Sequence, residues 1–497
     1  MFISDFGLKL QFQMPPKPFD WKCYNYLRKA LFADYHHSLS KVRERYDTIH
    51  FGTDGSAITK QLLREHDALA YGAYCENRNL YLFGQTNEAL QKAFDEFCRW
   101  ARREEKEYDF PEQGFLFCGS LNNANNVWKE LSAITPSNDR RIRVYNCGDD
   151  SLQQCYRANS SVSYYTSKKR LEKIGWKKLW ENSIAENLFC EYRKEGNSVY
   201  LSYIPCQKTL QITSGNATPW IDLPVQTAVC KPLLLQPWIT IGMGEILRLP
   251  DGRFILIDGG DITGCAQEML NTMRRYDILG ERKMEVAAWI ITHAHDDHYG
   301  ALTEFAEKYA DQLHVTQFIY NIPDGSETVF CENRDNSMRE VMKKIFPTFG
   351  NPPVCKIHAG AVVRIGEAQI TFLGTHEERN VPYLEQMNDT CTIFEVALGG
   401  KRILFTGDLY SGGATFLESM YGSNLKCDIL QVPHHGHCNS ANESFFARCR
   451  AKTALIPMCG TIQSPASIQT TVKRLQKGGT EEILITKNDK SAIEISL

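Results

Sequence analysis

Three histidines and two aspartates fall within six consecutive residues, a density of ligand-type side chains that could bind metal. The segment follows an apolar run and reads Ile290-Ile291-Thr292-His293-Ala294-His295-Asp296-Asp297-His298. Imidazole and carboxylate are the ligands that zinc prefers, and a turn after a strand can direct them at two neighbouring points. A chance cluster of polar turn residues is disfavoured, because the whole chain has only 13 histidines. The segment therefore predicts a metal centre with room for two ions.

Other candidate residues also come directly after short apolar runs. Asp258, Asp408 and His434 each lie just beyond such a run, as His293 does. Strand ends at one edge of a sheet collect functional groups in α/β proteins, because strands are rigid and the loops beyond them can vary. We therefore expect these side chains to join the cluster around His293. A water molecule shared by two divalent cations loses a proton near neutral pH, so the prediction is hydrolysis by a metal-bridging hydroxide.

The order of these motifs resembles that of the metallo-β-lactamase superfamily. Its HxHxDH signature is matched at residues 293–298, and segments similar to its other motifs lie at 256–260, 406–408 and 432–436. The HHG form of the last segment resembles the soluble hydrolase domain of bacterial DNA-uptake (competence) proteins, as do residues 242–245, 388–390 and 483–497. The resemblance covers roughly residues 225–497 and implies an α/β fold there, the four-layer αββα sandwich.

The resemblance also implies which side chains hold the metals. The implied ligands are His293, His295, Asp297, His298, Asp408 and His434. In this arrangement His293 and His295 hold one ion, Asp408 bridges both, and the remaining three hold the other. Asp258 is expected to orient the ligands from behind, as carboxylates beside metal-bound histidines do. We expect two divalent cations, with Zn2+ as the first choice and Mn2+ as the alternative.

Catalytic roles are assigned from the same resemblance. The expected catalytic residues are Asp297, Asp408 and His435. His435 and His437 could each donate a proton to the leaving group, contact a substrate oxygen, or be ordinary turn residues. The sequence leaves these alternatives open.

One position departs from the superfamily pattern. Most members have a further histidine between the first cluster and the bridging aspartate, and Asn388 stands at the matching place here. An amide oxygen is a weaker ligand for zinc than imidazole. Three interpretations follow: the first ion is held loosely, the site accepts manganese, or His376 in the preceding Gly-Thr-His-Glu loop fills the gap.

Three functions are compatible with these residues. The first is hydrolysis of a phosphodiester or related phosphate ester, with a small-molecule or nucleotide-type substrate. The second is hydrolysis of a carboxylic ester, lactone or amide, which the same centre can perform. The third is a regulatory protein whose metal site is catalytically degenerate, an interpretation that Asn388 keeps open. We favour the first because of the resemblance to the DNA-uptake branch.

The length and composition of the chain indicate how many domains it has and where they meet. A chain of 497 residues exceeds the roughly 250 to 300 residues of a single core, so two domains are expected. The polar stretch 207–219 predicts a linker. This divides the chain into a mixed α/β domain, 1–219, of unknown role and a catalytic domain, 220–497. The first could restrict access to the site or recruit a partner protein.

Hydrophobic periodicity predicts elements in both halves. In the first half we expect strands at 68–75 and 79–83 and helices at 22–32, 87–103 and 167–181. The last of these helices carries many lysines and two tryptophans, so it is either a nucleic-acid contact or, as we favour, a solvated lysine face. In the second half, short apolar runs alternate with amphipathic helices, at 253–258, 266–279, 286–292, 299–313, 337–346, 402–406, 428–432 and 468–478.

The sequence argues against a membrane protein. Residues 1–18 lack the order of a secretory signal, and apolar stretches such as 286–291 are far shorter than the roughly 20 residues that span a bilayer. The formal charge of −3 gives no overall attraction for polyanions or anionic membranes, so nucleic-acid binding would need a local patch. The 17 cysteines are scattered, which favours reduced thiols and a cytoplasmic location.

Asn388→His tests whether this position is that of the missing ligand. The substitution adds an imidazole beside His293 and His295, so metal content per chain after dialysis against a weak chelator should rise. Asp408→Ala, which removes the proposed bridge, should lower the content of both sites. An unchanged content in Asn388→His, together with a loss in Asp408→Ala, would mean that Asn388 is not at the metal.

Overall fold

The computed structural model describes most of the chain beyond residue 150 and shorter segments before it. The described residues are 2–5, 8–13, 48–51, 57–65, 70–84, 89–90, 92–93, 96–97, 113–120, 134, 140–147, 151–220, 222–323, 334–379, 387–457, 465–486 and 491–497. Two compact units are present, Met1–Ser132 with Val329–Cys331, and Ala133–Thr328 with Glu332–Leu497. Among the described residues, no helix has the length and apolar character needed to cross a membrane.

The first unit contains a six-stranded sheet in the order β1-β2-β3-β5-β4-β6. Its elements are β1 (Phe2–Asp5), β2 (Leu8–Gln13), β3 (Thr48–Phe51), α3 (Ala57–Glu65), β4 (Ala70–Glu76), β5 (Asn79–Gly84) and β6 (Gly114–Ser120). Leu62 of α3 packs against Tyr81 and Phe83 of β5. The strands expected at 68–75 and 79–83 are confirmed as β4 and β5. Described residues between 89 and 97 are helical, as expected, whereas the helix expected at 22–32 lies outside the described residues.

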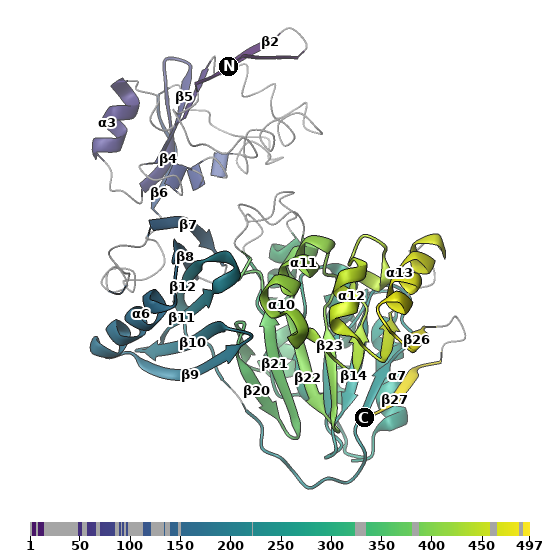
Figure 1. The fold of residues 1–497 in the computed structure, drawn as a ribbon. Helices are drawn as coiled ribbons and strands as arrows, with labels where there is room; N and C mark the ends of the chain where they lie inside the picture. Colours follow the sequence, from purple (N-terminus) through teal and green to yellow (C-terminus); the bar gives the residue numbers. More distant parts are fainter. Residues whose placement is uncertain are drawn as a thin grey trace. The chain divides into compact units, whose positions relative to one another are not determined.

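The second unit begins with an antiparallel sheet in the order β7-β8-β12-β11-β10-β9, which we call the flanking sheet (Figure 1). Its elements are β7 (Arg140–Asn146), β8 (Leu152–Arg157), α6 (Val162–Lys173), β9 (Lys177–Ile184), β10 (Asn187–Lys194), β11 (Asn197–Ile204), a 3-10 turn η1 (Pro205–Gln207) and β12 (Thr209–Asn216).

The helix expected at 167–181 is wrong in its second half. Helix α6 ends at Lys173, and Gly175 adopts a left-handed φ of +90° that lets the N–H of Trp176 close onto the carbonyl of Leu171 at 3.1 Å. The chain then enters β9, where Trp180 donates a hydrogen bond to Glu191. The lysines of this stretch are therefore divided between a helix and a strand.

The linker expected at 207–219 is wrong as well, because most of it is the buried strand β12. Its polar side chains are satisfied by neighbouring strands: Ser202 Oγ donates to Gln211 Oε1 at 2.7 Å, and Gln153 Nε2 donates to Thr213 Oγ1 at 3.1 Å. Hydrogen bonding of this kind lets polar residues occupy an interior strand. The linker was predicted from polar composition alone, which does not show these hydrogen-bond partners.

The rest of the unit is built on two face-to-face sheets (Figure 1). The first has the path β19-β18-β16-β15-β14-β13-β27, with β17 beside β16: β13 (Leu233–Gln236), β14 (Gly244–Arg248), β15 (Phe254–Asp258), β16 (Met284–Ile290), β17 (Leu313–Val315), β18 (Phe318–Ile319), β19 (Val354–Cys355) and β27 (Ile493–Ser496). The second runs in sequence order: β20 (Val362–Ile365), β21 (Ala368–Gly374), β22 (Ile393–Leu398), β23 (Lys401–Phe405), β24 (Ile429–Gln431), β25 (Thr453–Ile456) and β26 (Glu482–Ile485).

Alternating burial explains why helices cover both outer faces. In β15, Ile255 and Ile257 join a core between the two sheets, whereas Phe254 and Leu256 pack into a separate core with the helices of the first sheet. Those helices are α7 (Cys265–Tyr276), α9 (Ala301–Lys308) and α10 (Arg334–Ile345). The second sheet is covered by α11 (Ser411–Tyr421), α12 (Glu443–Cys449) and α13 (Pro465–Lys477). The expected four-layer αββα sandwich is confirmed.

The compact unit begins near residue 133, whereas the sequence predicts a domain boundary at 219/220. Phe189, Tyr200 and Ile204 of the flanking sheet belong to the same buried cluster as Leu373 and Leu417 of the sandwich. Asn182 Nδ2 also donates to Gly360 O at 2.9 Å. Because these strands share a core with the second sheet, the flanking sheet is part of the sandwich unit.

This shared core predicts different behaviour for two fragments of the chain. A fragment of residues 133–497 should be soluble and unfold cooperatively. A fragment of residues 220–497 leaves the Leu373 side of the cluster exposed and should be insoluble or melt at least about 10 °C lower, since several buried side chains lose their partners. Thermal unfolding followed by circular dichroism measures the difference. Equal melting temperatures would show that the flanking sheet folds independently.

Candidate metal centre

The candidate residues converge because neighbouring strands end at the same edge. Strands β15 and β16 pair in parallel, as do β23 and β24, so their carboxyl ends lie together. Asp258 ends β15, and the 293–298 turn follows β16. Asp408 follows β23, and the Pro433–Gly436 turn follows β24. Each sheet therefore contributes two adjacent strand ends to one site.

Asp258 is fully buried and holds the first cluster in place. Its carboxylate accepts hydrogen bonds from Thr292 N and Thr292 Oγ1, both at 2.8 Å, and from His298 Nδ1 at 2.8 Å. The contact with Nδ1 fixes the orientation of the His298 ring, whose Nε2 lies 3.1 Å from Asp408 Oδ2. The supporting role expected for Asp258 matches this geometry.

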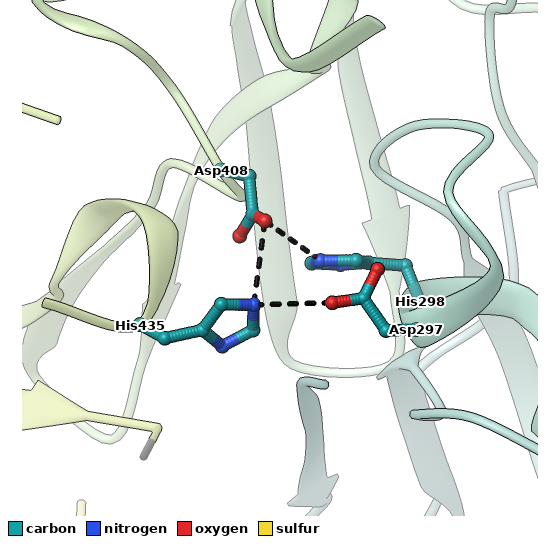
Figure 2. A group of neighbouring side chains, drawn as sticks. All are labelled: Asp297, His298, Asp408 and His435. Atoms are coloured by element: carbon teal, nitrogen blue, oxygen red, sulfur yellow. Dashed lines mark ion pairs between the residues drawn. The ribbon is translucent and has the colours of Figure 1, made fainter. Parts of the chain in front are cut away.

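Two groups of potential ligand atoms share Asp408. Asp297, His298, Asp408 and His435 form one group, shown in Figure 2. His435 Nε2 lies 3.3 Å from Asp408 Oδ2 and 3.5 Å from Asp297 Oδ2. Its Nδ1 donates to Pro457 O at 3.0 Å, which leaves Nε2 facing the carboxylates. His293, His295 and Asp408 form the second group, and in both groups the ligand atoms lie within 4.8 Å of one another.

The structure places His435, and not His434, in the first of these ligand groups. The sequence predicts His434 as the ligand, but it belongs to neither group, and its Nε2 lies 3.7 Å from Asp408 Oδ2. Both residues have a left-handed φ, +49° and +53°, so the turn directs the two adjacent rings to different places. Spacing along the sequence cannot distinguish the two rings, because the choice depends on this backbone conformation.

The two residues considered for the missing ligand lie in different places. Asn388, in the 3-10 turn η5 (Met387–Thr390), lies at the edge of the centre, with its Nδ2 3.5 Å from His434 Nε2. His376 is fully buried with its Nε2 3.0 Å from Asn321 Oδ1, and burial lowers its pKa to about 3. His376 therefore does not fill the gap.

The electrostatics of the centre favour cation binding. Burial lowers the pKa of His293 well below its usual value, and the neighbouring His298 lowers it further, so the ring is neutral. Burial opposes ionisation of Asp408, but His298 and His435 outweigh it and hold its pKa well below the usual range. His293 Nε2 and Asp408 Oδ1 are buried and have no hydrogen-bond partner among the described residues. Because unpaired buried polar atoms are costly, these residues fit a pair of divalent cations.

Glu245 lies near the site, and the sequence analysis included it in the resembling segment 242–245 without predicting a role for it. Its side chain, in β14, is completely buried, and neither carboxyl oxygen has a hydrogen-bond partner among the described residues. Burial and the charge of Asp258 raise its pKa well above the usual value. The available signal was a glutamate next to the apolar pair Ile246-Leu247 in a strand before Asp258.

Comparison with known proteins identifies the sandwich. A sequence profile described as the metallo-beta-lactamase superfamily matches residues 246–460. The sandwich is a metallo-β-lactamase domain. This is a fold of metal-dependent hydrolases, and the expected resemblance is confirmed.

Individual relatives of the metallo-β-lactamase domain are distant. ComE operon protein 3 of Bacillus subtilis (strain 168) is 25% identical over 232 residues, which are 44% of this chain and 27% of that protein. The match therefore spans about a quarter of the relative's length. Zn(2+)-bound PqqB from Methylobacterium extorquens aligns over 52% of this chain and 88% of its own, at 11% identity and a TM-score of 0.33. CmlA, a diiron β-hydroxylase from Streptomyces venezuelae, aligns over 55% of each chain at 12% identity and a TM-score of 0.34.

The positions of the adjacent histidines predict unequal effects on metal binding. His435→Ala removes a nitrogen that converges with Asp297, His298 and Asp408, so zinc affinity at one site should fall at least about tenfold. His434→Ala should leave zinc affinity within about twofold, because that ring lies outside both groups. Competition with a chromophoric chelator measures both affinities. A larger loss in His434→Ala than in His435→Ala would restore the ligand assignment expected from the sequence.

Proposed function

We propose that the metallo-β-lactamase domain hydrolyses phosphodiesters or related phosphate esters with two divalent cations. Zn2+ is the metal that we expect, and Mn2+ is the alternative. The observation that supports this proposal is the pair of ligand groups sharing Asp408. Bound divalent cations supply Lewis acidity, which makes a water molecule more acidic and stabilises charge on a phosphoryl oxygen.

The chain's own residues have distinct tasks in this proposal. Asp258 orients His298, and the Pro457 carbonyl orients His435, so neither ring has to reorganise on binding. Asn388 Oδ1 and His434 Nδ1 are buried beside the centre without a hydrogen-bond partner among the described residues. Asn388 Oδ1 could accept a hydrogen bond from a hydroxyl of a bound ester, and His434 Nδ1 could donate to one of its oxygens in the tautomer that carries a proton there.

The choice of phosphate esters as the substrate class rests on the resemblance to the DNA-uptake proteins. Residues 242–245, 388–390 and 434–436 resemble the DNA-uptake branch, and the distant match to ComE operon protein 3 points in the same direction. We infer a small-molecule or nucleotide-type substrate from this. We also infer that the N-terminal part of the chain, predicted from the sequence as residues 1–219, restricts access to the centre or recruits a partner protein.

The proposal predicts that the purified chain, loaded with Zn2+ or Mn2+, hydrolyses bis-p-nitrophenyl phosphate faster than p-nitrophenyl acetate or a lactone. Asp408→Ala should lower kcat/KM by about two orders of magnitude or more, because it removes the shared carboxylate. Release of p-nitrophenolate and of lactone-derived acid measures the rates. Turnover of lactones or carboxylic esters without turnover of the phosphodiester would contradict the substrate class. A metal-loaded chain that is inactive on all three would indicate a metal-binding regulatory protein.

A further inference from the structure

The flanking sheet holds one loop of the metallo-β-lactamase domain, residues 375–379. Tyr200 Oη donates to Glu378 Oε1 at 2.9 Å and lies 3.0 Å from Ala359 O. Gln211 Nε2 donates to the main-chain oxygen of Glu378 at 3.3 Å. Thr375 N donates to Glu378 Oε2 at 2.8 Å and closes the loop on itself. Tyr200, Gln211 and Glu378 are completely buried, so these bonds hold the loop in one position.

Arg379, the last residue of this loop, connects the loop to the edge of the metal centre. Arg379 Nη1 donates to Asp389 O at 2.9 Å and to Asp389 Oδ1 at 2.5 Å. Both side chains are less than a tenth exposed. A charged hydrogen bond and a main-chain bond to the same residue fix the turn η5 more firmly than either alone. Asn388 precedes Asp389 in that turn, so its amide is fixed at 3.5 Å from His434 Nε2.

We propose that Tyr200 of the flanking sheet and Arg379 are positioning residues, which hold Asn388 against His434 at the edge of the metal centre. The contacts run without a gap from Tyr200 through Glu378 and Arg379 to Asp389. The consequence for catalysis rests on the proposed function, because Asn388 matters for turnover only if the centre binds an ester.

Loss of the Tyr200 hydroxyl would disturb the loop at residues 375–379. Removing the Tyr200 hydroxyl leaves Glu378 Oε1 without its donor in a fully buried position, so the loop must shift or admit water. Arg379 is adjacent in sequence and moves with it. A shift of about 1 Å at Asn388 is large for a group that contacts substrate.

Tyr200→Phe and Tyr192→Phe form a matched pair for the test. Both tyrosines are completely buried in neighbouring strands, and each donates to a glutamate, but Tyr192 Oη bonds Glu172 of α6, away from the loop. Each variant loses one hydroxyl, but Glu172 is exposed whereas Glu378 is buried, so the free energy of unfolding of both variants is measured as well and the exchange rates are compared after correction for it. Gln211→Leu, which removes the donor to Glu378 O, is a second variant on the same path.

The first measurement is amide hydrogen exchange in the full chain. We expect Tyr200→Phe and Gln211→Leu to accelerate exchange at residues 375–379 and 387–392 by about fivefold, because these segments are fixed by the same bonds. Tyr192→Phe should leave both segments unchanged. Equal exchange in all three variants would overturn the proposal. This readout requires no activity, so it remains decisive even if the chain hydrolyses no ester.

The second measurement is a double-mutant cycle on kcat/KM for bis-p-nitrophenyl phosphate. If Tyr200 acts through Asn388, Tyr200→Phe should lower kcat/KM about fivefold in the otherwise native chain and less than about twofold in an Asn388→Ala background. Arg379→Lys should behave like Tyr200→Phe, since it keeps the charge and loses the paired bonds to Asp389. If the loss of kcat/KM in the double variant equals the product of the losses in the two single variants, Tyr200 does not act through Asn388 and affects stability alone.

Discussion

Both ligand groups meet at the carboxylate of Asp408, and the geometry of the candidate centre depends on where that carboxylate is held. Gln431 Oε1 accepts a hydrogen bond from Gly407 N at 2.9 Å, and Asp408 N donates to Cys391 Sγ at 3.2 Å. Gly407 has a φ of +53°, and a Cβ there would lie 3.0 Å from both Cys391 Sγ and Thr292 Oγ1. Glycine is therefore favoured here, because another residue would be strained at this φ and its Cβ would press against both neighbours.

The charges around Asp408 couple metal binding to proton release. Burial disfavours a charged His298, but Asp408, Asp258 and Asp297 outweigh it and raise the pKa of His298 well above its usual value. The same balance, with Asp408 as the largest opposing charge, raises the pKa of His435. A cation bound to these rings and carboxylates would compete with protons for the same atoms, so its affinity is expected to fall as the pH falls.

The flanking sheet lies outside the matched residues 246–460, yet it holds a loop of the sandwich. Polar residues such as Gln211 and Thr213 occupy buried strand positions because Ser202 and Gln153 satisfy them. Tyr200 of the same sheet bonds a loop of the sandwich, so the face that packs against the sandwich also holds that loop. Composition predicts a linker for β12 because it cannot show which partners surround a polar side chain.

The sequence by itself predicted the alternation of short strands and helices in the second half and the clusters of histidine and aspartate that follow the strands. The four-layer sandwich and the ligand set came from the resemblance of these motifs to the metallo-β-lactamase superfamily. Only the tertiary structure decided which of His434 and His435 faces Asp408, that Asn388 lies against His434, and that His376 is turned to Asn321. These outcomes depend on left-handed turns and on contacts between segments far apart in the chain, neither of which residue spacing encodes.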